Sequence, residues 1–182
     1  MKTESTVKFI LRLALTLLAI TAVVAVALAG VNMITEPAIA ELNAKNTQAA
    51  IEAVLPGGGE EMADFPAVDL VSKVYASDSG YAVQVTPGGF DNTITMMVGV
   101  DKAGNVLGID VISHTETAGL GAVADAGTPA GVAFREQFIG AAGSVSVTKD
   151  GGQMDAITGA TITSRAVCAG VNAALDCVAN LG

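Results

Sequence analysis

Hydrophobic and polar residues follow three different patterns along this chain, and the first is an uninterrupted apolar run. Residues Leu13 to Ile34 read LALTLLAITAVVAVALAGVNMI and contain no charged side chain. As a helix with a rise of about 1.5 Å per residue, these 22 residues are about 33 Å long. That length crosses the hydrocarbon core of a bilayer, so the run predicts a transmembrane helix.

The charges on either side of the run predict its orientation. Lys2, Lys8 and Arg12 precede it, whereas the first charge after it is Glu36. The cytoplasmic flanks of membrane helices are enriched in Lys and Arg. We therefore expect a cytoplasmic N-terminus, a single pass through the cell membrane and an extracytoplasmic C-terminal domain.

A cleaved signal peptide is the alternative interpretation of this run. The sequence ALAG at residues 27–30 resembles the small-residue site at which signal peptides are cut. However, the apolar core of a signal peptide is usually about 7 to 15 residues long, and this run is longer. The pattern therefore favours a permanent anchor in contact with membrane lipid.

The second pattern is moderately amphipathic and follows Pro37. Residues 38–55 (AIAELNAKNTQAAIEAVL) place apolar side chains among polar ones at helical spacing. This spacing predicts a helix that continues the membrane helix after a break at the proline. The Gly- and Pro-rich stretch 56–67 then predicts a loop.

The third pattern has a period of two and predicts strands. Four segments alternate apolar and polar residues, with DSG, PGGFD and DKAGN between them as turns. Successive strands joined by short turns predict an antiparallel meander. The strand-like segments are 68–77, 80–86, 92–101 and 105–113.

The remainder of the chain predicts a loop, two short elements and a final helix. Residues 113–131 are rich in glycine and form a loop long enough to indicate a functional role. We expect a short helix at 134–140 and a strand at 144–149. From Thr163 onward, apolar residues recur at helical spacing, which predicts a C-terminal helix packed on the sheet.

Together these elements predict the α+β fold class. We expect an N-terminal transmembrane helix followed by a domain with an antiparallel sheet and packed helices. We divide the chain into a cytoplasmic N-terminus with the transmembrane helix (1–35), an amphipathic helix and linker (36–67) and an extracytoplasmic domain (68–182).

Charge and composition exclude several partners and sites. Six basic and 17 acidic residues follow the apolar run, a net charge of about −11, which excludes nucleic acid as a partner. One histidine and no CxxC motif leave no ligand set for zinc or an iron–sulfur cluster, so we expect no metal site. Cys168 and Cys177, nine residues apart, would lie on opposite faces of the predicted helix, which prevents a disulfide within it.

Hydroxyl side chains gather where the final helix begins, in the sequence DAITGATITSRAV. They belong to Thr158, Thr161, Thr163 and Ser164. One interpretation is a helix cap, which needs only one hydroxyl. The other is a phosphate-binding turn, because a glycine lets a ligand approach the backbone and a helix N-terminus offers unpaired N–H groups. Residue chemistry alone leaves both interpretations open.

The same residues carry a resemblance to a known family. Asp155, Thr158-Gly159-Ala160-Thr161 and Thr163 fit the pattern D-x-x-[S/T]-G-A-[S/T]-x-[S/T], the flavinylation motif of the FMN-binding domain family. The resemblance implies that FMN is attached covalently, through its phosphate, to the hydroxyl of Thr161. A separate flavin transferase would make this bond by moving the FMN moiety from FAD.

The resemblance also implies roles for the other residues of the motif. Thr158, Gly159 and Ala160 would form the turn that presents the reactive hydroxyl. Thr163 and Ser164 would donate hydrogen bonds to phosphate oxygens, with helix capping as their alternative role. Asp155 would orient the loop or assist the metal of the transferase.

A second stretch resembles the same family. HTETAGLG at residues 114–121 is similar to the H-x-E-T-P-G-L-G loop that lines the flavin. Ala118 stands where the family has proline, a departure that reduces the rigidity of the loop. The resemblance implies that five residues of this loop belong to the flavin pocket: His114, Glu116, Thr117, Gly119 and Leu120.

Anchor, meander, loop and C-terminal turn together resemble the G subunits of Rnf complexes over nearly the whole chain. That resemblance implies an electron-carrier subunit of a membrane-bound ferredoxin:NAD oxidoreductase coupled to cation translocation, rather than a complete enzyme. Its partners would be the other membrane and flavin subunits. The alternatives are a free-standing anchored carrier, the usually longer C subunit of a sodium-pumping NADH:quinone reductase, and an anchored binding or scaffold module without flavin.

Overall fold

The computed structural model describes residues 6–181 and divides into two compact units between Ala44 and Lys45. The first unit is helical, and the second contains the sheet and the remaining helices. The two units differ in how their apolar side chains are arranged. The first is a helix with exposed apolar side chains, whereas the second buries an ordinary hydrophobic core.

Helix α1 (Thr6–Val54) contains the predicted membrane segment. Its part from Lys8 to Val54 includes a window that is apolar and long enough to cross a membrane, and this window is not buried inside the structure. The large apolar side chains between Phe9 and Ile34 are all at least half exposed. A continuous apolar surface of this kind is unfavourable in water and favourable in lipid.

The predicted break at Pro37 is wrong, because α1 continues through this residue. Proline lacks the N–H that would bond to the carbonyl four residues earlier, so it removes one hydrogen bond from the helix. The bonds on either side persist, and long apolar helices tolerate such a proline.

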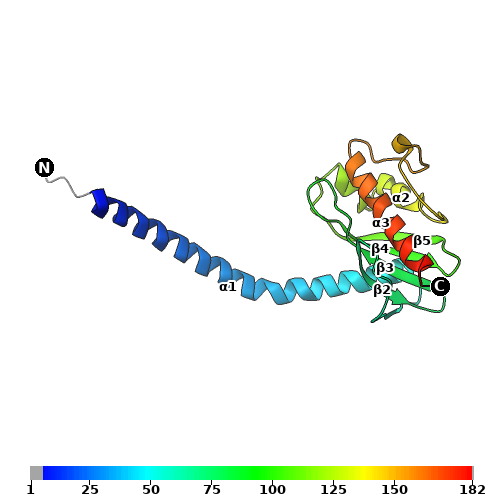
Figure 1. The fold of residues 1–182 in the computed structure, drawn as a ribbon, viewed down its shortest axis with the longest axis horizontal. Coiled ribbons are helices and arrows are strands. Elements are labelled where there is room, and N and C mark those ends of the chain that lie inside the picture. Colours follow the sequence, from blue (N-terminus) through cyan, green and yellow to red (C-terminus); the bar gives the residue numbers. More distant parts are fainter. Residues whose placement is uncertain (1–5, 182) are drawn as a thin grey trace. The chain divides into compact units, whose positions relative to one another are not determined.

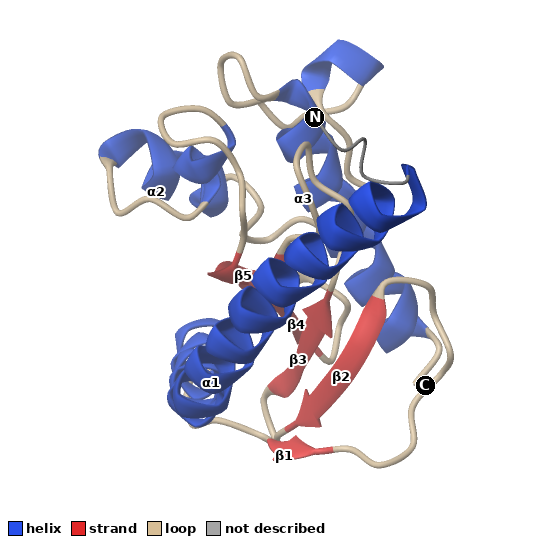
Figure 2. Ribbon diagram, turned by 90° about the vertical axis from the view of Figure 1, so that its left-hand side faces the viewer, coloured by secondary structure: helices blue, strands red, loops and turns tan. Residues whose placement is uncertain are grey.

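The four predicted strands form an antiparallel meander, which confirms the expected fold class. They are β2 (Val71–Ala76), β3 (Gly80–Val85), β4 (Thr95–Asp101) and β5 (Val106–Ser113). A short strand, β1 (Glu60–Glu61), adds to the edge and was not predicted. The spatial order β1-β2-β3-β4-β5 follows the sequence, as Figure 2 shows.

The sheet is covered on both faces. Alternate residues such as Val83 and Val98 point into the main core, where helix α3 (Thr161–Ala179) packs. Their neighbours, such as Ala82 and Met97, face the last residues of α1, including Ile51. Figure 1 shows α3 beside strands β2, β3 and β4. The period-two alternation therefore separates two apolar layers rather than a core from solvent.

Two glycines allow the helices to approach the sheet closely. At Gly99 of β4, an added Cβ would collide with the backbone of Val54 near the end of α1. At Gly170 of α3, a Cβ would crowd Val85 and Met96. The sheet, α3 and the end of α1 therefore pack tightly together within the second unit.

Two short elements differ from the sequence expectation. The predicted strand at 144–149 is absent: a 3-10 turn, η2 (Thr148–Asp150), and a single bridge between Val147 and Met154 replace it. The Asn172 side chain bonds to both backbone groups of Val145, at 2.8 and 2.9 Å, in place of a neighbouring strand.

The predicted helix at 134–140 lies earlier in the chain, as α2 (Pro129–Glu136). Thr128 caps it by accepting a hydrogen bond from the Gly131 N–H at 3.3 Å, and Pro129 occupies its first turn. Thr-Pro is a helix-start signal. The long loop before it contains a further 3-10 turn, η1 (Gly121–Ala124).

Candidate functional site

The turn before α3 has an ordered backbone built around Gly159. This glycine has φ +79°, a left-handed conformation that residues with a Cβ rarely adopt. Ser164 holds the backbone of the turn in place, because its hydroxyl donates to the Ala160 carbonyl and accepts from the Ile157 N–H, both at 2.9 Å. Ser164 is fully buried, so this hydroxyl shapes the turn from inside the fold.

Helix α3 begins without a side-chain cap. Its N-cap residue is Ala160, which makes no capping hydrogen bond, and the first helical residue is Thr161. The N–H groups of a first helical turn have no partners within the helix and carry partial positive charge. The helix start therefore offers donors at the surface where Thr161 lies half-buried.

Lys149 contacts the Thr161 hydroxyl from the η2 turn. Its Nζ donates to Oγ1 at 3.0 Å. The next residue, Asp150, accepts two hydrogen bonds from Arg165, the fifth residue of α3, at 2.6 and 2.7 Å. The Arg165 guanidinium lowers the pKa of Asp150, and Asp150 in turn raises the pKa of Arg165. This bidentate pair joins the η2 turn to the helix that carries Thr161.

Glu116 joins three segments beneath the turn. One carboxylate oxygen accepts from the Thr163 hydroxyl at 2.6 Å. The other accepts from the backbone N–H groups of Phe90 at 2.8 Å and Asp91 at 3.4 Å, in the loop between β3 and β4. The side chain is 8% exposed, and its space depends on Gly121, where a Cβ would collide with both Glu116 and Thr163. The carboxylate is buried but well supplied with donors.

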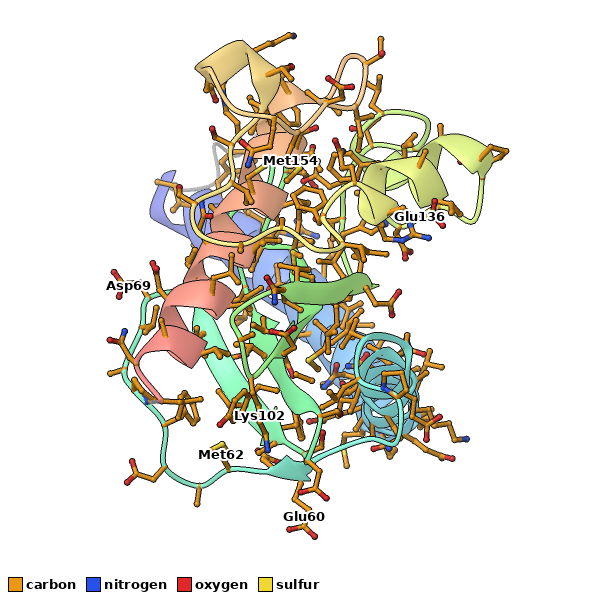
Figure 3. All side chains as sticks on the ribbon, turned by 90° about the vertical axis from the view of Figure 1, so that its right-hand side faces the viewer. Glu60, Met62, Asp69, Lys102, Glu136 and Met154 are labelled. Atoms are coloured by element: carbon orange, nitrogen blue, oxygen red, sulfur yellow. The ribbon has the colours of Figure 1, made fainter. Side chains whose placement is uncertain are left out.

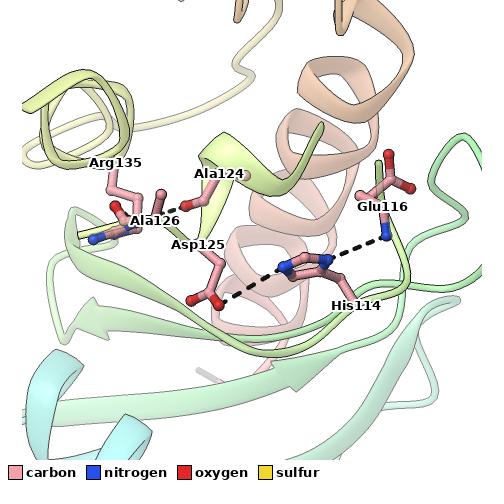
Figure 4. Close-up of polar contacts among 6 residues, drawn as sticks. All are labelled: His114, Glu116, Ala124, Asp125, Ala126 and Arg135. Carbon is pink, nitrogen blue, oxygen red and sulfur yellow. Dashed lines mark hydrogen bonds and ion pairs between the residues drawn. The ribbon is translucent and has the colours of Figure 1, made fainter. Parts of the chain in front are cut away.

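His114 fixes the start of the same loop. Its Nδ1 accepts from the Glu116 N–H at 3.1 Å, and its Nε2 lies 3.7 Å from an oxygen of Asp125 (Figure 4). Arg135 of α2 donates to the carbonyls of Ala124 and Ala126 further along. These contacts hold the loop that lacks the proline of the family pattern.

Two pockets flank the turn. The first, of about 280 Å³, lies on the side of Glu116 and Thr161, and includes the exposed side chains of Phe90 and Ile162. The second, of about 460 Å³, lies against α2. Its wall includes Asp155, whose backbone is held by Gln137 through bonds of 2.7 and 3.1 Å.

The residues expected from the sequence divide between these pockets. Those that line the first are Glu116, Thr117, Leu120, Gly159, Ala160, Thr161 and Thr163. Those that line the second are Gly119, Asp155 and Thr158. His114 and Ser164 line neither pocket and support the backbone instead. The Thr163 hydroxyl donates its hydrogen bond to Glu116, a partner that the sequence did not indicate.

Sequence reasoning missed four residues that line the first pocket: Phe90, Gly121, Lys149 and Ile162. Phe90 was assigned to a turn, and Lys149 to the end of a strand that does not form. The only sequence signal for Phe90 was an apolar residue within a turn sequence, which is weak evidence for a site. The contact of Lys149 with Thr161 had no sequence signal.

Both cysteines lie away from these pockets, in the core. They are free and buried. Burial raises the pKa of Cys168 to about 11 and also raises the pKa of Cys177. A high thiol pKa keeps both residues protonated and unreactive at neutral pH, as expected for packing residues.

Comparisons with known proteins identify the family. Residues 89–176, which include both pockets, match the FMN-binding domain. The chain is 33% identical to the G subunit of the Na(+)-translocating ferredoxin:NAD(+) oxidoreductase complex of Acetobacterium woodii, over 96% of this chain and 94% of that protein. It is also 33% identical to the G subunit of the ion-translocating oxidoreductase complex of Methanosarcina acetivorans, over 94% and 95%.

The G subunit of the ion-translocating oxidoreductase complex of Vibrio cholerae shares 41% identity over a shorter region, 52% of this chain and 46% of that protein. The similarity to the first two relatives extends through the apolar helix as well as the folded unit. Together the candidate membrane helix and these relatives support a membrane location. The chain therefore belongs to the family of G subunits of ion-translocating (Rnf) oxidoreductase complexes, and its folded unit contains their FMN-binding domain.

Proposed function

We propose that this chain is the electron-carrier subunit of an Rnf-type ferredoxin:NAD oxidoreductase and relays electrons through FMN bound covalently to Thr161. The observation that carries the proposal is the Thr161 hydroxyl, placed at a helix N-terminus without a side-chain cap, beside a cation and in the lining of a pocket. Family membership supplies the class of complex.

The residues around Thr161 fit the phosphate end of FMN. A phosphate group is stabilised by backbone N–H donors at a helix start and by a nearby ammonium group. Both are present, from the first turn of α3 and from Lys149. Gly159 leaves the approach open, because it has no side chain beside Leu120.

The attachment reaction uses the Thr161 hydroxyl as a nucleophile. Its Oγ1 would form a bond to the phosphorus of the FMN half of FAD, the pyrophosphate P–O bond to AMP would break, and AMP would leave. The hydroxyl proton would pass to a base of the flavin transferase. The product is a phosphodiester between Thr161 and the ribityl chain, with one negative charge.

The wall of the first pocket suits an aromatic ring that must exchange electrons with other proteins. When bound, FMN supplies the electron transfer, and the protein supplies position and solvent access. Phe90, Leu120 and Ile162 offer apolar surface and are themselves 67%, 44% and 49% exposed. A pocket of about 280 Å³ lies at the small end of ligand sites, so part of the ligand would stay accessible to a partner.

The rest of the complex would supply what this chain lacks. We propose a cytoplasmic N-terminus and an extracytoplasmic flavin domain, in agreement with the basic residues before the apolar run. Among the described residues there is one candidate membrane helix, and its apolar run carries no ionisable side chain that would form an ion path. Cation translocation would therefore belong to other membrane subunits.

A covalent tether has a physical advantage outside the cytoplasm. A dissociated cofactor would be diluted into the surroundings, whereas a bond to Thr161 keeps a permanent local concentration. The flavin transferase is needed only for maturation.

Peptide mass mapping of the full-length protein, purified from its native membrane, tests the proposal together with in-gel flavin fluorescence after denaturation. We expect an FMN adduct on the Thr161 peptide and its complete loss in Thr161→Ala. Thr93→Ala is the matched control, because Thr93 is exposed and lines neither of the two pockets. An unmodified Thr161 peptide in the wild-type protein would contradict the proposal.

Co-purification tests the assembly separately. We expect the solubilised protein to bring multispanning membrane subunits with it. A flavin-loaded protein that purifies alone under mild solubilisation would instead be a free-standing carrier.

A further inference from the structure

A ligand tethered to the turn before α3 could lie in either of two pockets. Thr161 lies at the first pocket, and Thr158, three residues earlier, lies at the second. A flavin bound to Thr161 through a flexible ribityl chain must settle on one side of this turn. The size of the pockets does not favour the first, because the second is the larger at about 460 Å³.

The charges of the two pockets differ. Among the described residues, the only basic side chain lining the first pocket is Lys149. The described lining of the second pocket contains the carboxylate of Asp155 and no basic side chain. The carboxylate of the first pocket, Glu116, is already bonded to Thr163 and to backbone N–H groups. An anion attached to Thr161 is therefore attracted to one side and repelled from the other.

Resting on the proposed attachment at Thr161, we propose that Lys149 pairs with the phosphodiester and directs the tethered flavin into the first pocket. Lys149 is thus a positioning residue, which acts on the linkage rather than on the ring.

The position of Lys149 before attachment supports this role. Its ammonium already lies 3.0 Å from Oγ1, the atom that becomes the ester oxygen. The two non-bridging oxygens of the phosphodiester are bonded to the same phosphorus as Oγ1. A lysine carries three N–H donors on a flexible stem, so a small rotation transfers the hydrogen bond to these oxygens.

The η2 turn that carries Lys149 is itself held in place. Asp150 forms the bidentate pair with Arg165 near the start of α3. On the other side, the Thr148 N–H donates to the Met154 carbonyl at 2.8 Å. Lys149 therefore keeps its place relative to Thr161 even though its own side chain is exposed.

Time-resolved fluorescence anisotropy of the attached flavin tests the proposal in the full-length protein. Rapid local motion of the ring reports how firmly the linkage is held, on the nanosecond timescale. We expect Lys149→Gln to increase the amplitude of this motion about twofold and Lys149→Arg to restore it. In the wild type, raising the salt concentration should produce part of the same increase, because an exposed ion pair is screened.

Lys102→Gln is the matched control. It removes the same charge from the turn between β4 and β5, and Figure 3 shows Lys102 at the opposite end of the folded unit from Met154, the residue that pairs with the η2 turn. Anisotropy is compared per flavin-labelled molecule, after mass mapping has confirmed the adduct at Thr161. Wild-type protein without an adduct would overturn the proposed function and this inference together. Labelled protein with equal motion in the wild type and Lys149→Gln would overturn the inference alone.

A pair of tryptophan variants tests the direction. Tryptophan quenches flavin fluorescence on contact, so Phe90→Trp in the first pocket should shorten the fluorescence lifetime. Ala130→Trp, at an exposed position of the second pocket, should leave it unchanged. Adding Lys149→Gln to each variant should reduce the difference in flavin fluorescence lifetime between Phe90→Trp and Ala130→Trp. Equal or stronger quenching from position 130 in an otherwise wild-type chain would contradict the assigned direction.

Discussion

The hydroxyl groups at the start of α3 divide into a partly exposed half and a buried half, and the two halves have different roles. Thr161 is half-buried, and its hydroxyl accepts a hydrogen bond from a flexible lysine. Thr163, two residues later, is 1% exposed and donates to a buried carboxylate. One helical turn thus presents one hydroxyl to solvent and uses another to join distant segments. The motif combines a reactive group with the internal bonds that hold it in place.

Replacing each threonine with the isosteric valine tests whether the two hydroxyls have different roles. Thr161→Val should abolish FMN attachment and leave the free energy of unfolding nearly unchanged. Thr163→Val should keep attachment but lower the free energy of unfolding by about 1–3 kcal/mol, because one oxygen of buried Glu116 loses its donor. In-gel fluorescence and chemical denaturation measure the two effects. Equal stability losses would show that the two halves are not distinct.

Gly121→Ala tests how tightly the buried Thr163 hydroxyl and Glu116 are packed. The new Cβ would collide with Glu116 and Thr163, so we expect a loss of about 1–2 kcal/mol, within the range for overpacking. Gly127→Ala is the control, because a Cβ at Gly127 meets nothing within 4 Å. Thermal denaturation of both variants measures the difference. A Gly121→Ala variant as stable as the control would indicate that the carboxylate moves aside easily.

The smallest effect is expected at the exposed ion pair, from Asp150→Asn. Arg165 lowers the pKa of Asp150, so the pair stabilises the fold above the ordinary carboxyl pKa of 3.8, and this contribution disappears as the pH falls through the lowered value. Both side chains are substantially exposed, so the effect on stability should be small. Melting temperatures of wild type and variant should differ slightly at pH 7 and converge in acid. A difference that persists in acid would have another cause.

The regular elements could be predicted from the sequence because their signals are local. Period-two alternation gave the four long strands, and the recurrence of Val167, Val171 and Val178 gave α3. The helix-start signal at Thr128 and Pro129 was also local but was outweighed by a later apolar pattern. Residues 113–131 were expected to form a long functional loop, and the structure shows that they also contain the η1 turn and the start of α2.

The internal connections of the site could not be predicted, since they join residues far apart in the chain. Glu116 bonds to Thr163, 47 residues away, and to the backbone of Phe90, 26 residues away. Neither distance has a sequence signature. Resemblance to the family named Glu116 and Thr163 separately, but only the structure shows that they bind each other. Lys149 was hidden for a related reason, because alternating residues before it predicted a strand.

The close fit of Glu116 also has an evolutionary consequence. Its carboxylate occupies space that is available only because Gly89 and Gly121 have no side chains, and a Cβ at either position would collide with it. A substitution at one of these positions is therefore acceptable only if another changes as well. Across lineages, positions 89, 116 and 121 should therefore change together. A residue shorter than glutamate at position 116 should be accompanied by a residue other than glycine at position 121.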